Sequence, residues 1–215
     1  MTADDHIVFI VDDDARLREA LSELLDSHGM RAAAFGSAGE YIRAEKADVP
    51  ACLILDVELP DINGLELQRQ IAQGDHPPIV FITGHGDIPS SVRAIKHGAV
   101  DFLTKPFSDD DLMAAVQAAI SEDRRRRSAR AELSRLRQRY LELTPREREV
   151  LPLVVSGLLN KQAAAELGIS EVTLEIHRRN VMQKMAVSSF ADLVRVAERL
   201  EIPITHSRRA GGSKT

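Results

Sequence analysis

The first 121 residues alternate between short apolar runs and longer amphipathic segments. Five apolar runs predict β-strands, at 7–11, 31–35, 52–55, 79–82 and 100–103. The segments that follow them have helical periodicity, at 15–28, 37–46, 64–73, 89–97 and 109–121. Strands that alternate with helices form a parallel sheet that is covered on both faces. We therefore expect residues 1–121 to form a doubly wound (βα)5 domain.

The strand signal disappears after residue 121. Residues 122–143 contain no Gly or Pro, and we expect a helical linker there. Apolar residues recur along it at coiled-coil spacing: Ala129, Leu133, Leu136, Tyr140 and Leu143. This spacing fits either a dimerising helix or a plain solvated linker. The run RRRR at 124–127 is interpreted as solvated charge, with contact to DNA phosphates as the alternative.

Four helices are expected in residues 144–203. Thr144, Pro145 and Glu147 mark the start of the first helix. Gly157 ends it, and the later helices are expected at about 160–167, 171–185 and 189–200. A short helix, the Gly168 turn and a helix capped by Ser170 are typical of a helix-turn-helix unit. The chain therefore combines an α/β domain with an all-α domain.

Two features depart from this regular pattern. Pro152 falls inside the first helix of the second domain, where it should kink the helix or cost ~3 kcal/mol. The tail, residues 204–215, is polar and contains Gly, and we expect it to be disordered.

The overall charge hides a division between the two halves of the chain. Residues 1–121 hold 9 Lys/Arg and 21 Asp/Glu, a formal charge of −12, whereas residues 122–215 hold 19 and 12, a charge of +7. This asymmetry indicates an acidic regulatory half and a half that meets a polyanion. With 4% aromatic residues and no Trp, a protein that binds single strands by base stacking is disfavoured.

The sequence also limits the cellular compartment and the cysteine chemistry that we expect for the protein. Cys52 is the one cysteine of the 215 residues, so no intramolecular disulfide or Cys-based zinc finger can form, and we interpret it as a buried small hydrophobe. We expect no signal peptide, because only a short apolar run follows Asp4 and Asp5, and the sequence has no run of ~20 apolar residues. We expect a cytoplasmic protein with no membrane partner.

Polar side chains follow or close four of the predicted strands. Asp12 and Asp13 come after the first strand, Asp56 after the third, Thr83 after the fourth and Lys105 after the fifth. Because the carboxyl ends of parallel strands meet at one edge of a sheet, these groups are expected to converge. Carboxylates, a hydroxyl and a lysine suit Mg²⁺ and a phosphoryl group. The Asp56 carboxylate is the candidate nucleophile, which would form an acyl phosphate.

These segments carry a resemblance to a known family. VDDD, LILDVELPDINGLEL, FITGHGD and AVDFLTKPF make residues 7–121 similar to the receiver domain of two-component response regulators, which has a flavodoxin-like fold. The resemblance implies that Asp56 is the phosphoacceptor. It implies that Asp12 and Asp13 form the acidic pair, with Asp13 bound directly to Mg²⁺ (or Mn²⁺). The backbone carbonyl of Glu58 would be the third protein ligand.

The same resemblance assigns the residues that respond to phosphorylation. Thr83 and Lys105 match the switch hydroxyl and the lysine of the family, and the peptide before Pro106 is expected to be cis. Phe102 occupies the aromatic switch position, although a residue of an apolar strand can also be simply core. Glu58 and His85 fall at positions that tune phosphate lifetime in the family, and a loop histidine without a role is the alternative for His85.

The second half resembles the LuxR-type helix-turn-helix domain through LTPREREVL, GLLNKQAAAELGIS, VTLEIHRRNVMQKM and DLVRVA. We expect Val172, Leu174, Val181 and Met185 to pack inward, with Ile176 or Met182 partly contributing. The side chains expected to lie outward are Glu175, Arg178, Arg179 and Gln183. The resemblance implies that Glu175, Ile176 and Arg179 face the major groove. It makes Lys161, Thr173, His177 and Lys184 candidates for phosphate contacts or for the framework.

The domain also departs from its family at two positions. Glu175 stands where many relatives carry Lys, which lowers the expected phosphate affinity, and Ala163 replaces a larger apolar residue. The domain order is similar to the NarL/FixJ group, and ITGHGD with the long linker favours FixJ-, StyR- and TodT-like members.

The function expected from this combination is phosphorylation-dependent transcription regulation. A sensor histidine kinase would phosphorylate Asp56, and the chain would then dimerise and bind double-stranded DNA with inverted half-sites. One alternative is a phosphate-independent DNA-binding regulator whose first domain is an interaction module. The other is an aspartate-nucleophile phosphatase, for which Glu58 has the spacing of a second carboxylate. Because no cap insertion is present, we expect no turnover of an external substrate.

Overall fold

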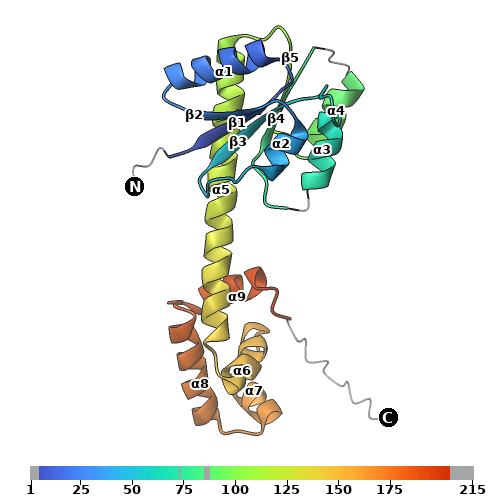
Figure 1. The fold of residues 1–215 in the computed structure, drawn as a ribbon. Helices are drawn as coiled ribbons and strands as arrows, with labels where there is room; N and C mark the ends of the chain where they lie inside the picture. The colour runs from blue at the N-terminus through green and yellow to red at the C-terminus, as the bar shows by residue number, and fades with distance from the viewer. Residues whose placement is uncertain (1–4, 73, 85–87, 204–215) are drawn as a thin grey trace, which may run out of the picture. The chain divides into compact units, whose positions relative to one another are not determined.

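The computed structural model describes residues 5–72, 74–84 and 88–203 (Figure 1). The expectations for His85 and for the tail, residues 204–215, lie outside the described residues. The chain divides into two compact units, Met1–Ser128 and Ala129–Thr215. None of the described helices is long and apolar enough to cross a bilayer.

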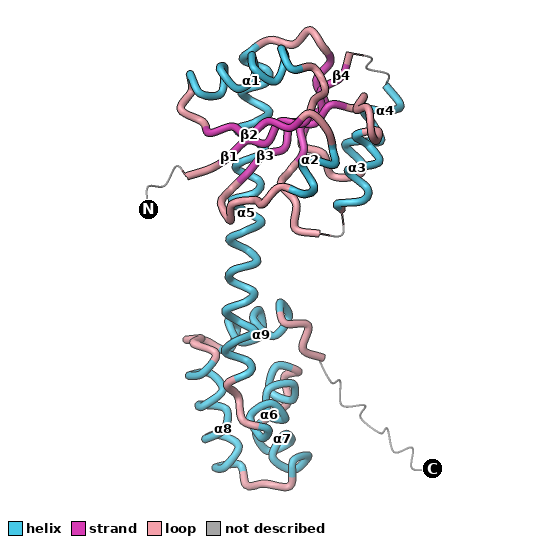
Figure 2. The backbone as a smooth tube through the Cα atoms, in the orientation of Figure 1, coloured by secondary structure: helices cyan, strands magenta, loops and turns pink. Residues whose placement is uncertain are grey.

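A five-stranded parallel sheet forms the centre of the first unit (Figure 2). The strands are β1 (Ile7–Val11), β2 (Arg31–Phe35), β3 (Ala51–Asp56), β4 (Ile79–Thr83) and β5 (Asp101–Thr104). Their order is β2-β1-β3-β4-β5, and every pair is parallel. All five strands were predicted from the apolar runs, and the doubly wound fold is confirmed.

Helices cover both faces of this sheet (Figure 1). They are α1 (Ala15–Ser27), α2 (Ala38–Arg43), α3 (Gly64–Ile71), α4 (Ile88–Lys96) and α5 (Asp109–Leu141). Successive strand residues point to opposite faces, so Ile54 packs with Leu25 of α1 and Val116 of α5, whereas Leu55 packs with Leu67 of α3 on the other side. Cys52 is fully buried, as expected, and burial raises the pKa of its thiol.

The linker is helical, as expected, and it continues the helix that begins at Asp109, so that α5 is one helix. Ser108 begins this helix by accepting a hydrogen bond from the Asp111 N–H at 3.1 Å. The boundary between the two compact units falls inside the helix, after Ser128. Leu136 and Leu143 of the apolar seam are buried, and Tyr140 packs against the core of the helical unit. These seam positions are therefore covered within a single chain.

Three arginines of the run at 124–127 form ion pairs with acidic side chains, and Arg124 and Arg125 are exposed. Arg125 and Arg126 both pair with Glu122, and Arg127 pairs with Asp48 and Asp123. Asp123 is only 1% exposed, and its Oδ2 accepts hydrogen bonds from the Ala51 N–H at 2.9 Å and from Arg127 Nε at 2.8 Å. This buried carboxylate fastens α5 to the start of β3.

Four helices surround the core of the second unit: α6 (Pro145–Val155), α7 (Asn160–Leu167), α8 (Glu171–Lys184) and α9 (Phe190–Arg199). Thr144 and Glu147 form the predicted capping box at the start of α6. Gly168 adopts the left-handed conformation (φ 65°) that ends α7, and Ser170 caps α8. The predicted helix-turn-helix is confirmed. Helix α6 is continuous through Pro152, and Ala163 is fully buried in the core.

Candidate functional site

The predicted polar groups meet at the carboxyl edge of the parallel sheet. Asp12 follows β1, Asp56 closes β3 and Lys105 follows β5. Lys105 Nζ donates to Asp12 Oδ2 at 2.8 Å and to Asp56 Oδ2 at 3.0 Å. The lysine therefore bridges carboxylates from two neighbouring strands, although the three residues are far apart in the sequence.

Burial sets the electrostatics of this site. Asp12 is fully buried and Asp56 is 5% exposed. Burial raises the pKa of the Asp56 carboxyl, and the hydrogen bonds from Lys105 and from the Glu58 N–H offset only part of that effect. Burial alone would lower the pKa of Lys105, but its bonds to Asp12 and Asp56 outweigh burial, and the net pKa is raised. The lysine thus stays charged between the two carboxyl groups.

The donor set of the site fits a hard divalent cation. Asp12, Asp13 and Asp56 each offer one carboxylate oxygen, and these oxygens lie within 4.8 Å of one another. Asp13 is exposed, so the cluster opens to solvent on one side. Such a cation binds a few carboxylates and keeps several waters. The Glu58 N–H donates to Asp56 Oδ1 at 3.2 Å, which brings Glu58 beside this cluster.

The third aspartate of the VDDD segment has a different task. Asp14 is the N-cap of α1, and its Oδ1 accepts from the backbone N–H groups of Arg16 and Leu17. The Asp14 N–H in turn donates to Asp12 Oδ1 at 2.8 Å. Asp14 therefore orients Asp12 and starts the helix, which is the usual role of an Asp that follows a strand.

Two residues that shape the site were missed by the sequence reasoning. A Cβ atom on Gly64 would lie 2.3 Å from the Asp56 carbonyl oxygen, so a side chain has no room there. Asp61 accepts from the N–H groups of Ala38 and Gly39, at 3.3 and 2.8 Å, and thereby joins the loop after Asp56 to α2. The Asn63–Gly64 pair signals a turn, but nothing in the sequence identifies the opposing carbonyl.

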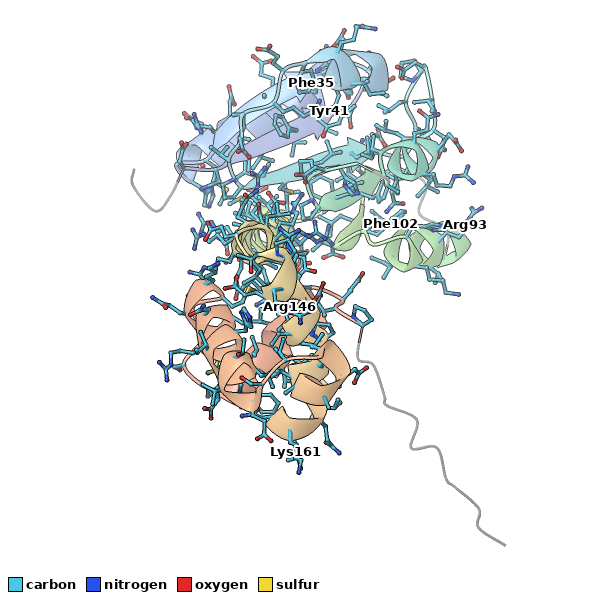
Figure 3. The ribbon with its side chains drawn as sticks, turned by 90° about the horizontal axis from the view of Figure 1, so that it is seen from below. Phe35, Tyr41, Arg93, Phe102, Arg146 and Lys161 are labelled. Carbon is cyan, nitrogen blue, oxygen red and sulfur yellow. The ribbon has the colours of Figure 1, made fainter. Side chains whose placement is uncertain are left out.

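The expected switch residues lie on β4, on β5 and directly after β5. Thr83 is fully buried and pairs in register with Thr104, and its carbonyl accepts from the Lys105 N–H at 2.8 Å. Phe102 is half-buried, with its ring centroid 6.1 Å from that of Phe81. Figure 3 shows Phe102 on the same side of the first unit as Arg93 of α4. The Lys105–Pro106 peptide is cis, as expected.

In the helical unit, α8 buries three of the four apolar residues that were expected to face inward. Leu174, Val181 and Met185 are buried, which confirms the prediction for them. The prediction for Val172 is wrong, because its exposed fraction is 68%. Val172 is two residues before Leu174, which places it about 200° around the helix from that buried position. Ile176 is also exposed, at 51%.

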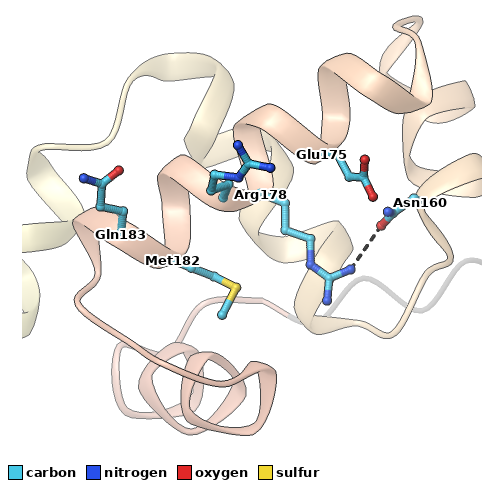
Figure 4. A pocket seen from close by; sticks show the side chains of 6 residues that line it. Asn160, Glu175, Arg178, Met182 and Gln183 are labelled. Carbon is cyan, nitrogen blue, oxygen red and sulfur yellow. Dashed lines mark hydrogen bonds between the residues drawn. The ribbon is translucent and has the colours of Figure 1, made fainter.

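The polar residues that were expected on the outward face of α8 fall into two groups. Glu175, Arg179 and Gln183 are exposed, as expected. Arg178 is half-buried, and its guanidinium donates to Asn160 Oδ1 at 3.1 Å (Figure 4). The guanidinium also lies 5.4 Å from the ring centroid of Phe190. Arg178 therefore links α8 to α7 and α9. A cavity of about 550 Å³ lies along this side of α8, lined by Asn160, Glu175, Arg178, Arg179, Met182 and Gln183.

The other predicted DNA contacts differ in how they are held. Lys184 Nζ is 2.7 Å from Oε2 of the buried Glu147, which favours a framework role. The Thr173 hydroxyl lies 2.8 Å from Ser170 Oγ at the N-cap of α8. His177 is half-buried, and its Nδ1 finds no hydrogen-bond partner within the described ranges. Lys161 is exposed near the start of α7 (Figure 3).

Both units match known families. Residues 8–117 match the response regulator receiver domain, and residues 141–197 match the luxR family of bacterial regulatory proteins. The chain therefore belongs to the response regulators of the NarL/FixJ family, which join a receiver domain to a LuxR-type DNA-binding domain. It is a transcriptional response regulator.

Particular relatives match along almost the whole chain. Nodulation protein W of Bradyrhizobium diazoefficiens is 50% identical over 204 residues, which cover 94% of this chain and 90% of the relative. Response regulator protein TodT of Pseudomonas putida is 48% identical over 196 residues, 91% of this chain and 86% of TodT. The solved structure of response regulator StyR has a TM-score of 0.78 and 46% identity, covering 90% of this chain and 98% of StyR.

Proposed function

We propose that this response regulator accepts a phosphoryl group on Asp56 from a sensor histidine kinase, and that phosphorylation promotes dimerisation and binding to specific sites in double-stranded DNA. The observation that carries the proposal is the bridge from Lys105 to Asp12 and Asp56. The bridge lies beside the acidic cluster, in the same chain as a helix-turn-helix. A promoter-binding protein of this kind acts in the cytoplasm.

The chemistry is the transfer of one phosphoryl group between two nucleophiles. An Asp56 carboxylate oxygen forms a bond to phosphorus while the P–N bond of the phosphohistidine donor breaks. The electron pair of that bond stays on the imidazole nitrogen of the donor. Hydrogen bonds from Lys105 Nζ and the Glu58 N–H already hold the two Asp56 oxygens in a fixed orientation. This alignment lowers the entropic part of the barrier.

A divalent cation, Mg²⁺ or Mn²⁺, would neutralise negative charge on the transferred phosphoryl oxygens when bound. Asp12, Asp13 and Asp56 would hold it through their carboxylates, together with the Glu58 carbonyl. Lys105, with its positive charge, would neutralise part of the same negative charge. In the proposed phosphorylated state it donates to a phosphoryl oxygen in place of Asp56 Oδ2.

The proposed signal runs from these groups to the β4–β5 edge. Thr83 donates its hydroxyl to the phosphoryl group, and Phe102 changes its position on β5. Phe102 is only half-buried, so its ring can reorient without opening the centre of the core. Phosphorylation then shifts a two-state equilibrium of the receiver domain toward the form that dimerises. For the DNA-binding domain, we assign base contacts to Glu175, Ile176 and Arg179, and phosphate contacts to Lys161.

The proposed phosphoacceptor is tested by intact-protein mass spectrometry after incubation with acetyl phosphate and Mg²⁺. We expect one phosphate per wild-type chain and none in Asp56→Asn, because the amide is a far weaker nucleophile than the carboxylate. Asp13→Asn and omission of Mg²⁺ should each slow the labelling. The assignment would be wrong if Asp56→Asn were labelled to the same extent as the wild type. Steady hydrolysis of a small phosphoester would instead favour a phosphatase.

A further inference from the structure

The exposed face of α8 carries two aliphatic side chains, Val172 and Ile176. Of these two, only Ile176 has a DNA contact assigned above. Val172 is 68% exposed and Ile176 is 51% exposed, whereas Leu174 and Val181 of the same helix are buried. A Val and an Ile that stay in water do not contribute the hydrophobic stabilisation that they would give if they were buried. Neither residue contributes its full packing to the core, so a ligand that covers them would gain from the contact.

The helical spacing places these two residues at the centre of the outward face. Val172, Ile176, Arg179 and Gln183 stand at i, i+4, i+7 and i+11, so they form one stripe along α8. All four are exposed, and the stripe lies opposite Leu174 and Val181. Val172 is the second residue of α8. The N-terminal residues of a recognition helix are the ones that reach base edges in a major groove.

We propose that Val172, together with Ile176, reads the 5-methyl groups of thymines in each DNA half-site, which makes Val172 a specificity-determining residue. The proposal rests on the proposed DNA-binding function of this domain. Thymine is distinguished in the major groove by its methyl group, and apolar side chains recognise it by direct contact. Arg179, in the same stripe, can pair with guanine, and Glu175 beside it can accept from cytosine.

The surroundings of the pair fit DNA better than a protein partner. A stable protein interface needs about 800 Å² from each partner, and the stripe continues from Ile176 into Arg179 and Gln183 rather than into further apolar surface. Residues 122–215 carry a net charge of +7, which complements a phosphate backbone. The half-site read by this stripe therefore contains at least one thymine beside a guanine or cytosine.

The test removes the methyl group from the DNA without changing any hydrogen bond. A preferred site is first selected from random double-stranded DNA by the full-length protein with beryllofluoride and Mg²⁺. Each thymine of that site is then replaced in turn by deoxyuridine, which lacks only the methyl. We expect about fourfold weaker binding at one or two positions per half-site, the equivalent of about 0.8 kcal/mol for one buried methyl.

The protein variants assign the effect to a residue. At one thymine position, Val172→Ala should bind the thymine and the deoxyuridine versions of the site with equal affinity. Ile176→Ala should do so at a different thymine position. Leu159→Ala is the matched control, since Leu159 is 70% exposed in the same domain but precedes α7. This variant should keep the full fourfold methyl dependence.

The possible failures can be told apart. If every deoxyuridine version of the enriched site is bound as tightly as the thymine version, the proposed methyl contacts are wrong. The proposed function is then left intact. Undiminished methyl dependence in Val172→Ala overturns the assignment to Val172, whatever the result for Ile176→Ala. If no DNA sequence is enriched above random DNA, sequence-specific binding and the methyl reading fail together.

Discussion

Single residues decide whether the Asp56 carboxylate is held in place for the phosphoryl transfer that we propose. Lys105 contacts two carboxylates directly, whereas Gly64 acts by leaving space for the Asp56 backbone. The Gly64 N–H also donates to the Val57 carbonyl at 2.9 Å, which draws the start of α3 close to the end of β3. A side chain at position 64 would push these two elements apart, and the position of Asp56 depends on their contact.

We predict that Gly64→Ala destabilises the receiver domain by about 1–3 kcal/mol, the usual cost of inserting a carbon into a closely packed site. It should also slow labelling of Asp56, because the added Cβ meets the Asp56 carbonyl. Urea denaturation and mass spectrometry measure the two effects. Gly36→Ala is the control, since its Cβ would make only ordinary contacts of 3.6 Å or more. Equal stability and labelling of both variants would contradict this account of Gly64.

Residue roles could be predicted from the sequence where they depend on near neighbours in the chain. The Thr144–Glu147 capping box and the turn at Gly168 are set within a few residues, and both predictions are confirmed. The contact between Arg178 and Asn160 joins positions on different helices, so only the folded chain reveals it. The convergence of Asp12, Asp56 and Lys105 was predictable despite its long range, because parallel strands place their carboxyl ends together.

At the scale of elements, the pattern of apolar residues predicted which elements form but not how far they extend. Helix α5 runs from Asp109 to Leu141, and it joins the helix expected at 109–121 to the helical linker expected after it, because no Gly or Pro interrupts the sequence there. The prediction for Val172 failed because it depended on hydrophobicity alone. An apolar residue two positions from a buried one lies on the opposite side of a helix, so hydrophobicity alone misplaced it.

Helices α6 and α8 are joined by a buried ionic contact with a defined pH dependence. Glu147 is 3% exposed, and burial alone would raise the pKa of its carboxyl. The bonds from Lys184 and Thr144 outweigh burial and lower the pKa below its usual value. Since the folded pKa is the lower one, this contact stabilises the folded unit above the unfolded pKa of about 4.3. That contribution is lost as the pH falls through the folded pKa.

We predict that Glu147→Gln, which keeps the shape of the side chain, destabilises the helical unit by about 1–3 kcal/mol at pH 7. The difference from wild type should shrink below pH ~4.3 as the wild-type carboxylate is protonated. Urea denaturation followed by Tyr140 fluorescence in a Tyr41→Phe background reports on this unit, because the chain has two Tyr and no Trp. A pH-independent difference would show that the charge on Glu147 does not matter.

At the scale of the whole molecule, an acidic receiver domain and a basic DNA-binding domain share one chain. Their opposite charges, −12 for residues 1–121 and +7 for residues 122–215, suit their different partners. The second domain meets DNA, and its affinity should fall steeply with salt because binding releases counterions from the phosphates. The acidic receiver domain carries the cluster that suits a cation and a phosphoryl group. The proposed regulation requires that phosphorylation of Asp56 changes the affinity for DNA.

The most direct test of that claim is the affinity of the full-length protein for its selected site, measured with and without beryllofluoride and Mg²⁺ at one fixed salt concentration. We predict that beryllofluoride tightens wild-type binding by about tenfold or more, within the usual range of allosteric coupling, and leaves Asp56→Asn unchanged. Equal wild-type affinity in both conditions, with Asp56 shown to be modified, would contradict the account and make DNA binding independent of the receiver domain.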